Sequence, residues 1–349
     1  MHKSSITDAF ILGYQRSKKT GTAREYGGFL AGKPLRLMST SEELSQMVLR
    51  TLAVDGPMPK NGAEAMFTLY LFEGLENMAM SVLEGLIPHQ DNENTVLVIN
   101  RGAIHLQYNP EGQILSLIDT ERSLAFYAVQ DCISLPDYEV CTPMRMIINW
   151  FLVMTNQTFL HAACVGWQGT GALLVGKSGA GKSTTALQCL IRGLSFLGDD
   201  YVAVSASLPH TAHRIYYGCK IMDDALIRMP SLQPYVIPTN KTKEKNVAIL
   251  DKSYALSMAD PTLLLSYILR PVQTHAAKTT FRSVSAMAVL GEFAGSTILQ
   301  MPGAGATMLR ALSTLCQHLQ TYDVMMSDDP DEVAGAIQTF LLDGGQCCD

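Results

Sequence analysis

Hydrophobic and polar positions follow two different periods along the first 140 residues. Residues 41–53 (SEELSQMVLRTLA) space their hydrophobic positions three and four apart behind Ser41, which predicts an amphipathic helix with a serine cap. Residues 94–129 instead alternate hydrophobic and polar positions on both sides of NPEG at 109–112, which predicts a strand–turn–strand unit. We therefore expect residues 1–140 to form a mixed α+β domain, and no pattern within it indicates a role.

The remainder of the chain begins with an apolar stretch at 144–160 (MRMIINWFLVMTNQTFL). Four polar residues interrupt it well short of the ~20 apolar residues that a membrane-spanning helix needs, so it predicts a buried helix. Further on, a strand pattern at 263–272 is followed by helical patterns at 305–320 and 329–345. Strands alternating with helices favour an α/β fold for residues 141–349.

Composition narrows the class of protein. Hydrophobic residues make up 47% of the 349 residues and charged residues 17%, which predicts folded domains with buried cores. The formal net charge of −6 argues against nucleic acid as a partner, because nucleic-acid-binding surfaces are basic. The chain begins without a secretory signal pattern, and its eight cysteines show no metal-ligand spacing. We expect a cytoplasmic protein that does not bind membranes.

Residues 176–183 (GKSGAGKS) match the phosphate-loop pattern G-x-x-x-x-G-K-[ST] at every position. Glycines let backbone N–H groups wrap phosphates in conformations that a Cβ atom would obstruct. An apolar strand pattern at 171–175 precedes the loop and a helical pattern at 183–193 follows it, so the helix N-terminus would face the anion. The alternative, a glycine-rich turn without a ligand, would not require these flanking elements.

The loop chemistry assigns roles to individual residues. Lys182 would bring its charge to the β- and γ-phosphates, and the Ser183 hydroxyl is a natural Mg²⁺ ligand. The predicted ATP-binding residues are Gly176, Lys177, Ser178, Gly179, Ala180, Gly181, Lys182, Ser183 and Thr184.

Two acids, Asp199 and Asp200, follow the predicted helix at the end of a short strand that begins at Leu194. Ligands of α/β sheets bind at the carboxyl ends of strands. Adjacent side chains on an extended segment point in opposite directions, so one acid would hold the metal and the other would take a proton from an acceptor. The alternative is a solvated turn, for which GDD is also suitable.

His161 lies in the first of two β-like runs, FLHAACVGW at 159–167 and GALLVGKS at 171–178, and QGTG at 168–171 between them predicts a hairpin. A four-residue turn would place Val165 opposite Leu174 and His161 level with Ser178 of the loop. That position would suit contact with the phosphates or proton transfer. The alternative is a structural histidine beside an apolar strand.

Together these features resemble the HPr kinase/phosphorylase family, whose catalytic domain has the phosphoenolpyruvate-carboxykinase-like fold. The motifs that carry the resemblance occur in the family's order and spacing, and they are His161-Ala162, the loop at 176–183, Arg192-Gly193 and Asp199-Asp200. The tight match covers about 45 residues. The resemblance implies an α/β, P-loop-containing HPr kinase-like catalytic domain over 141–349, behind an α+β domain over 1–140 that shows no resemblance.

The resemblance also implies the chemistry of a serine kinase that uses ATP and Mg²⁺. Asp199 would be the base that activates the acceptor hydroxyl, and Asp200 would be a carboxylate on the metal side. Lys182 and Ser183 would contact the phosphates and the metal, and His161 would be an active-site partner. Self-association would also fit the family.

The chain departs from the family at two places. The family's bifunctional members have Glu directly after the loop serine, where this chain has Thr184. Their E-I-R-G-L-G segment is missing, and YGCKIMDDA at 217–225 occupies that region, with Lys220 as a substitute cation. We therefore predict neither phosphorylase activity nor HPr as the substrate, but transfer to a serine-type hydroxyl of another peptide or protein.

Two other functions are compatible with these residues. One is a regulatory module that binds or slowly hydrolyses ATP and signals by a change of conformation. ATPases of this kind orient water with Glu or Gln near the metal, whereas this strand offers Asp199-Asp200-Tyr201, which favours a hydroxyl acceptor. The other is a kinase of a small metabolite such as free serine, and the sequence does not distinguish it from a peptide kinase.

Overall fold

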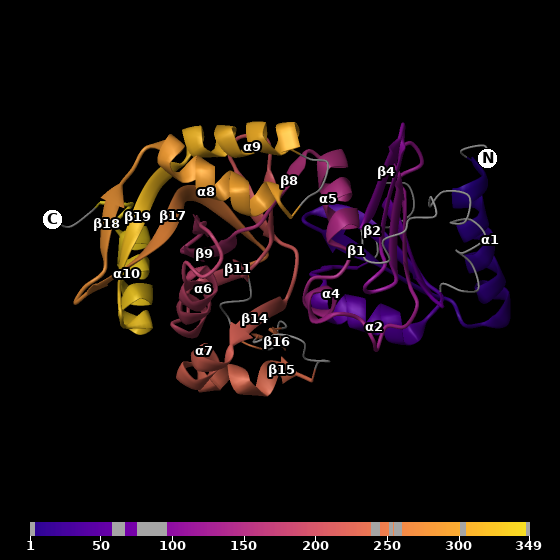
Figure 1. Cartoon of the computed structure of the whole chain (residues 1–349), viewed down its shortest axis with the longest axis horizontal. Helices are drawn as coiled ribbons and strands as arrows, with labels where there is room; N and C mark the ends of the chain where they lie inside the picture. Colours follow the sequence, from indigo (N-terminus) through magenta and orange to yellow (C-terminus); the bar gives the residue numbers. More distant parts are fainter. Residues whose placement is uncertain are drawn as a thin grey trace. The chain divides into compact units, whose positions relative to one another are not determined.

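The chain divides into two compact units, Met1–Thr155 and Asn156–Asp349 (Figure 1). The computed structural model describes residues 4–57, 67–74, 96–238, 245–250, 254, 260–300 and 305–346. Both units combine helices with β-sheets, so the predicted α/β class is confirmed at that level. None of the described helices combines the length and the apolar character needed to cross a membrane.

Unit 1 is built on a seven-stranded sheet with the order β1-β2-β3-β7-β6-β5-β4. Its strands are β1 Arg24–Leu30, β2 Lys33–Ser39, β3 Phe67–Glu73, β4 Leu97–Arg101, β5 Ile104–Asn109, β6 Ile114–Asp119 and β7 Leu124–Val129. The predicted turn at 109–112 joins β5 to β6, and the predicted strand–turn–strand unit is a four-stranded antiparallel meander. Strand β3 joins the meander to β2 through parallel pairs on both of its sides.

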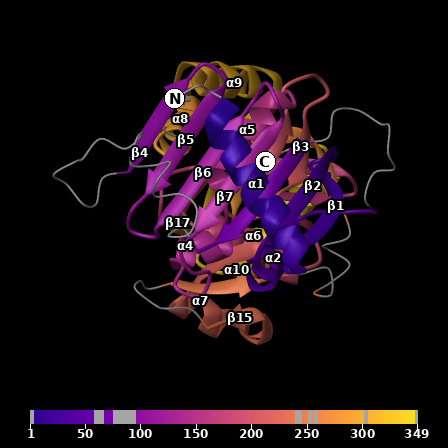
Figure 2. The same cartoon turned by 90° about the vertical axis from the view of Figure 1, so that its right-hand side faces the viewer.

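Helices cover both faces of this sheet. Helix α1 (Ser4–Thr20) crosses one face, where Phe10 packs against Phe72 and Phe126 (Figure 2). Helix α5 (Arg145–Met154) lies on the other face, because Phe151 packs against Phe67, five positions before Phe72 on the same strand. Strand β3 is accordingly buried at successive positions, on both faces of the sheet.

The remaining helices of unit 1 are α2 (Glu42–Thr51) and the short α4 (Asp137–Cys141). The predicted cap of α2 is confirmed, because the Ser41 side chain accepts a hydrogen bond of 3.1 Å from the backbone N–H of Leu44. The predicted domain boundary lies at 140/141, whereas the two compact units meet at 155/156. The reason is α5, whose apolar side packs on the sheet of unit 1.

Unit 2 contains a nine-stranded sheet whose main path is β11-β9-β10-β17-β13-β12-β8, with β19 beside β17 and β18 beside β19. Its strands are β8 Gln157–Leu160, β9 Ala163–Trp167, β10 Thr170–Leu174, β11 Ser195–Gly198, β12 Val202–Ser205, β13 Thr211–Arg214, β17 Thr262–Ala276, β18 Thr280–Ser283 and β19 Gln320–Ser327. Its long helices are α6 Lys182–Ile191, α8 Ala286–Ile298, α9 Gly305–His318 and α10 Pro330–Leu342. The predicted buried strand at 263–272 lies within β17, and the two predicted C-terminal helices are α9 and α10.

Two very short connections join opposite ends of this strand order. His161 and Ala162 alone connect β8, at one end, to β9, next to the other end. Residues 199–201 alone connect β11 to β12 in the same way. Two or three residues span only about 10–14 Å, so the two ends of the sheet must lie close together. The fold therefore brings His161 and the aspartate pair to one place.

A second, small sheet of unit 2 has the order β14-β16-β15. Its strands are β14 Gly218–Met222, β16 Lys245–Ile249 and β15 Val236–Ile237, and helix α7 (Asp223–Arg228) follows β14 directly. Strand β14 lies against α6, as Figure 1 also shows. This contact places Lys220, in the middle of β14, near the aspartate pair.

The hairpin of β9 and β10 has a tighter turn than predicted. Val165 faces Ala172, so the predicted pairing of Val165 with Leu174 is wrong by two positions. The turn consists of Gln168 and Gly169 alone, both with positive φ (51° and 84°), rather than of the four residues 168–171. Two-residue turns of this kind match the twist of antiparallel strands, which is why they dominate short hairpins.

Candidate active site

The phosphate loop lies between the end of β10 and the start of α6. Gly176 and Gly181 have φ of 144° and 92°, which lie in the region that favours glycine. The Lys182 ammonium donates hydrogen bonds to the carbonyls of Gly176 (2.7 Å) and Lys177 (3.2 Å) and so closes the loop. Among the described residues, no side chain caps the N-terminus of α6, so its first N–H groups are available to an anion at the loop.

The Lys182 side chain is buried at the base of the loop, with 7% of the residue exposed. Burial lowers the pKa of its ammonium, and the negative charges of Asp200 and Asp199 act in the opposite direction. The predicted loop residues Lys177, Ser178 and Gly179 are exposed. A phosphate at the loop would therefore meet exposed backbone on one side and the buried Lys182 on the other.

Asp199 is the most buried acid of this site, with 1% of the residue exposed. Its Oδ2 accepts a 3.2 Å hydrogen bond from the backbone N–H of Lys220. Burial, and then the charge of Asp200, raise the pKa of Asp199 to about 6, although the neighbouring Ser183 hydroxyl acts to lower it. Among the described residues, its buried Oδ1 makes no hydrogen bond that meets normal geometry. A carboxylate of this kind is able to accept a proton near neutral pH.

Asp200 is in a different environment from its neighbour. Its Oδ2 lies 3.0 Å from the Lys220 ammonium, and its Oδ1 lies 3.6 Å from Nε2 of His161. Burial alone would raise the pKa of Asp200, but the hydrogen bond from His161 and the charge of Lys220 outweigh it and hold the pKa below its ordinary value. Asp200 therefore stays ionised while Asp199 can be protonated, and such divergent pairs are typical of functional sites.

His161 lies beside Asp200 and not, as predicted, level with Ser178 of the loop. Its Nδ1 lies 3.2 Å from the backbone carbonyl of Ser296 on α8, and its Nε2 faces the Asp200 carboxylate. The ring also packs at 5.3 Å from that of Tyr201. These contacts hold the imidazole in one orientation and direct it at Asp200.

Helix α8 contributes to the site, although the sequence pattern did not predict it. Glu292 lies close to the loop, since one of its carboxylate oxygens is 3.7 Å from where a Cβ on Gly176 would stand. Its other oxygen is 3.3 Å from Arg270. Tyr201 donates a short hydrogen bond to Gln300, just beyond α8. The even hydrophobicity of 286–298 conceals its helical period, and no local signal places Glu292 near residue 176.

Oxygen ligands suitable for Mg²⁺ converge here. Mg²⁺ prefers carboxylate and hydroxyl oxygens, and the Ser183 hydroxyl stands beside Asp199, whose buried Oδ1 makes no hydrogen bond of normal geometry among the described residues. Asp200 adds a carboxylate that stays ionised. The residues present therefore fit a magnesium ion.

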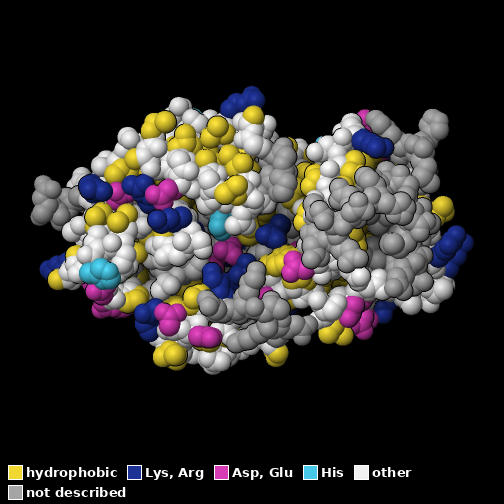
Figure 3. Space-filling model, viewed as in Figure 1, with side chains coloured by type: hydrophobic (Ala, Val, Ile, Leu, Met, Phe, Trp, Pro, Cys, Tyr) yellow, Lys and Arg dark blue, Asp and Glu magenta, His cyan; other side chains and the backbone are white. Residues whose placement is uncertain are grey.

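The surface in Figure 3 agrees with this arrangement. Histidine, acidic and basic side chains gather near the middle of the face in view, and hydrophobic side chains lie above them over α8 and α9. The mixed charges fit a site that holds an anion with a cation.

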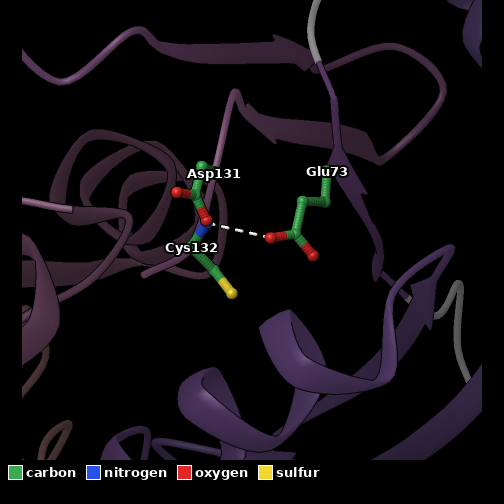
Figure 4. Close-up of side chains that lie close together, drawn as sticks. All are labelled: Glu73, Asp131 and Cys132. Atoms are coloured by element: carbon green, nitrogen blue, oxygen red, sulfur yellow. Dashed lines mark hydrogen bonds between the residues drawn. The ribbon is translucent and has the colours of Figure 1, made fainter. Parts of the chain in front are cut away.

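A second group of metal-type ligands, in unit 1, has a structural explanation. Glu73, Asp131 and Cys132 place ligand atoms within 4.8 Å of one another (Figure 4). Glu73 already accepts hydrogen bonds from the backbone N–H of Cys132 (2.9 Å) and from the Ser41 hydroxyl. Burial and the Glu73 carboxylate raise the pKa of the Cys132 thiol to about 12, so it is protonated at neutral pH. These bonds tie β3 to the start of α2.

Comparison with known proteins supports the resemblance around the loop. Residues 153–221 match the family model of the HPr Serine kinase C-terminal domain. The HPr kinase/phosphorylase of Geobacter sulfurreducens is 44% identical over 52 residues, which are 15% of this chain and 16% of that protein. The HPr kinase/phosphorylase of Malacoplasma penetrans is 38% identical over 60 residues, 17% of this chain and 20% of that protein.

The matches thus span a fifth or less of these relatives' length. The residues that match the family model, 153–221, contain His161, the loop at 176–183, Asp199, Asp200 and Lys220. The predicted resemblance is confirmed for this segment: residues 153–221 are HPr kinase-like.

Proposed function

We propose that this protein is an ATP- and Mg²⁺-dependent kinase that transfers the γ-phosphate to a serine-type hydroxyl of a peptide or protein. One observation carries the proposal. The loop residues Lys182 and Ser183 stand beside two adjacent carboxylates whose pKa values are shifted in opposite directions. A site with one carboxylate that stays charged and one that can take a proton suits transfer to a hydroxyl.

The loop would bind the nucleotide through its backbone N–H groups and Lys182, with Thr184 on the first turn of α6. Ser183 and Asp200 would hold Mg²⁺, which neutralises charge on the phosphates when bound. His161 would keep Asp200 in position through the contact between Nε2 and Oδ1. Each of these roles follows from the chemistry of the residue and its place at the loop.

The acceptor hydroxyl would attack the γ-phosphorus in line with the leaving ADP. The new O–P bond forms as the bond from the γ-phosphorus to the bridging oxygen breaks, and the hydroxyl proton passes to Asp199. With a pKa of about 6, Asp199 is mainly ionised at pH 7 and is still basic enough to accept that proton.

The names of the two relatives identify HPr as the protein on which they act. For this chain we propose a peptide or protein acceptor without naming it. Thr184 stands where the bifunctional members of the family have Glu, and Lys220 occupies the region of their glycine-rich segment. Acceptor recognition would therefore differ from that of these members.

The test is the fate of the γ-phosphate. Purified protein is incubated with γ-labelled ATP and Mg²⁺, alone and with extract from its own source, beside Lys182→Ala. We expect label on a peptide or protein, and none with the variant. Release of free phosphate alone would instead identify a regulatory ATPase, and label on a small molecule such as serine would identify a metabolite kinase.

A further inference from the structure

Lys220 forms hydrogen bonds with both aspartates of the pair. Its backbone N–H donates to Asp199 at 3.2 Å, and its ammonium donates to Asp200 at 3.0 Å. About a fifth of its side chain is exposed, so the ammonium is at the edge of the site and not sealed within it. A lysine placed in this way can reach a ligand that binds beside the acids.

The small sheet fixes the direction of this side chain. Cys219 and Ile221 on either side are fully buried, with 0% and 1% exposed. Successive side chains of a strand point to opposite faces, so Lys220 faces away from the buried side and toward the aspartates. Its backbone is held by pairing with Val247 on β16. The position is therefore rigid up to the Cβ atom, and the flexible part is the four-carbon stem.

Each acid has a contact besides the ion pair between Asp200 and the Lys220 ammonium. Asp200 also faces His161, and Asp199 accepts a hydrogen bond from the backbone N–H of Lys220. Partly buried ion pairs contribute little net stability, because desolvation offsets the attraction. The Lys220 ammonium can thus turn from Asp200 to a phosphate group while both carboxylates keep their other contacts.

We propose that Lys220 is a second catalytic cation, which contacts the transferring phosphoryl group on the side opposite Lys182. This inference rests on the proposed function. As the O–P bond to the acceptor forms and the bond to ADP breaks, charge spreads over the oxygens of the γ-phosphoryl group. Lys182 is anchored at the loop by two carbonyls, whereas Lys220 belongs to a separate sheet and contacts the two aspartates. Two cations from different elements would enclose the group.

The test compares binding of ADP alone with binding of ADP and aluminium fluoride, which mimics the transferring phosphoryl group, both with Mg²⁺. For Lys220→Met we expect aluminium fluoride to add about 10²-fold less affinity than in the unaltered protein, with ADP affinity changed less than about threefold. The Lys220→Arg variant should recover part of the loss. Calorimetry or displacement of a fluorescent nucleotide measures both affinities.

The matched control is Arg228→Gln, which removes a cation from α7, the helix that directly follows β14. Arg228 is exposed in an ion pair with Asp224, and the variant should behave as the unaltered protein. If Lys220→Met weakened ADP and ADP–aluminium fluoride equally, or weakened neither, the inference would be overturned. Should Lys220→Met not fold, Lys220→Gln, which keeps a polar side chain, carries the same comparison.

Failure of this inference is distinguishable from failure of the proposed function. If the unaltered protein transfers no phosphate and gains no affinity from aluminium fluoride, the proposed function is wrong whatever Lys220 does. If the unaltered protein does both and Lys220→Met matches it, only the role of Lys220 is wrong.

Discussion

Each unit of this protein buries a carboxylate, and the two differ in how their oxygens are used. In unit 1, Glu139 is 6% exposed and its Oε1 accepts hydrogen bonds from the Tyr127 hydroxyl (2.9 Å) and the backbone N–H of Met144 (2.7 Å). In unit 2, Asp199 is 1% exposed, and its Oδ1 has no hydrogen bond of normal geometry among the described residues. The first carboxylate joins α4 to the start of α5, and the second faces the phosphate loop.

This difference indicates a structural role for the buried Glu139 and a chemical role for the buried Asp199. A buried acid that accepts hydrogen bonds from neighbouring groups contributes to the stability of the fold, because removing it would leave those buried donors without an acceptor. A buried acid with an unused oxygen costs free energy unless a ligand or a proton supplies what is missing. Phosphate transfer at Asp199 would explain why unit 2 keeps so costly a group.

The largest expected effect is that of Asp199→Asn. Loss of the general base should lower turnover by about 10²–10⁴-fold, with ATP affinity changed less than about threefold. Because burial disfavours the charged form of Asp199, the free energy of unfolding at pH 7 should not fall. Steady-state kinetics, nucleotide binding and denaturant unfolding measure the three quantities.

The same variant distinguishes two divisions of labour between the acids. If Asp199 were chiefly a metal ligand, which its place beside Ser183 would allow, Asp199→Asn would raise the Mg²⁺ concentration needed for half-maximal activity. In the arrangement proposed here, Asp200→Asn shows that increase instead. Activity measured against Mg²⁺ for both variants decides between them.

The matching substitution in unit 1, Glu139→Ala, should have the opposite profile. It leaves the Met144 N–H and the Tyr127 hydroxyl without an acceptor, which should cost about 2 kcal/mol of unfolding free energy. Turnover per folded molecule should not change. Denaturant unfolding beside kinetics tests this, and a variant as stable as the unaltered protein would contradict the structural role.

Activity should depend on pH through Asp199. Its pKa is raised from 3.8 to about 6, and only the ionised form is a base, so kcat/KM for ATP should be constant above pH 7 and fall below pH 6. At pH 5 we expect about a tenth of the plateau value. Glu139→Ala should keep the same profile. A plateau that extends to pH 5 would show that no group with a pKa near 6 is essential.

The smallest expected effect is that of His161→Ala. His161 contacts Asp200 and the carbonyl of Ser296, so its loss should reduce turnover about tenfold by releasing Asp200, with little change in stability. Kinetics and thermal unfolding are measured together. A misfolded variant would show instead that His161 is a structural histidine beside Tyr201.

Local pattern was sufficient for much of the fold. The Ser41 cap, the turn at 109–112 and the buried strand at 263–272 were predicted because their signals lie within a few residues of one another. The helix behind the glycine-rich loop at 176–183 belongs to the same class, since its residues are contiguous. Phosphate binding at that loop stays a prediction. Helix α8 was missed because hydrophobic and small residues surround its whole circumference, which removes the period that marks a helix.

The sequence by itself therefore determined the glycine-rich loop at 176–183, the helix behind it and the presence of two acids nearby. Only the tertiary structure decided what surrounds those acids. Two connections of two and three residues between opposite ends of one sheet bring His161 to Asp200, and a strand of a separate sheet brings Lys220 to both. The pKa of a carboxylate depends on burial and on charges a few ångströms away, and those distances exist only in the folded chain.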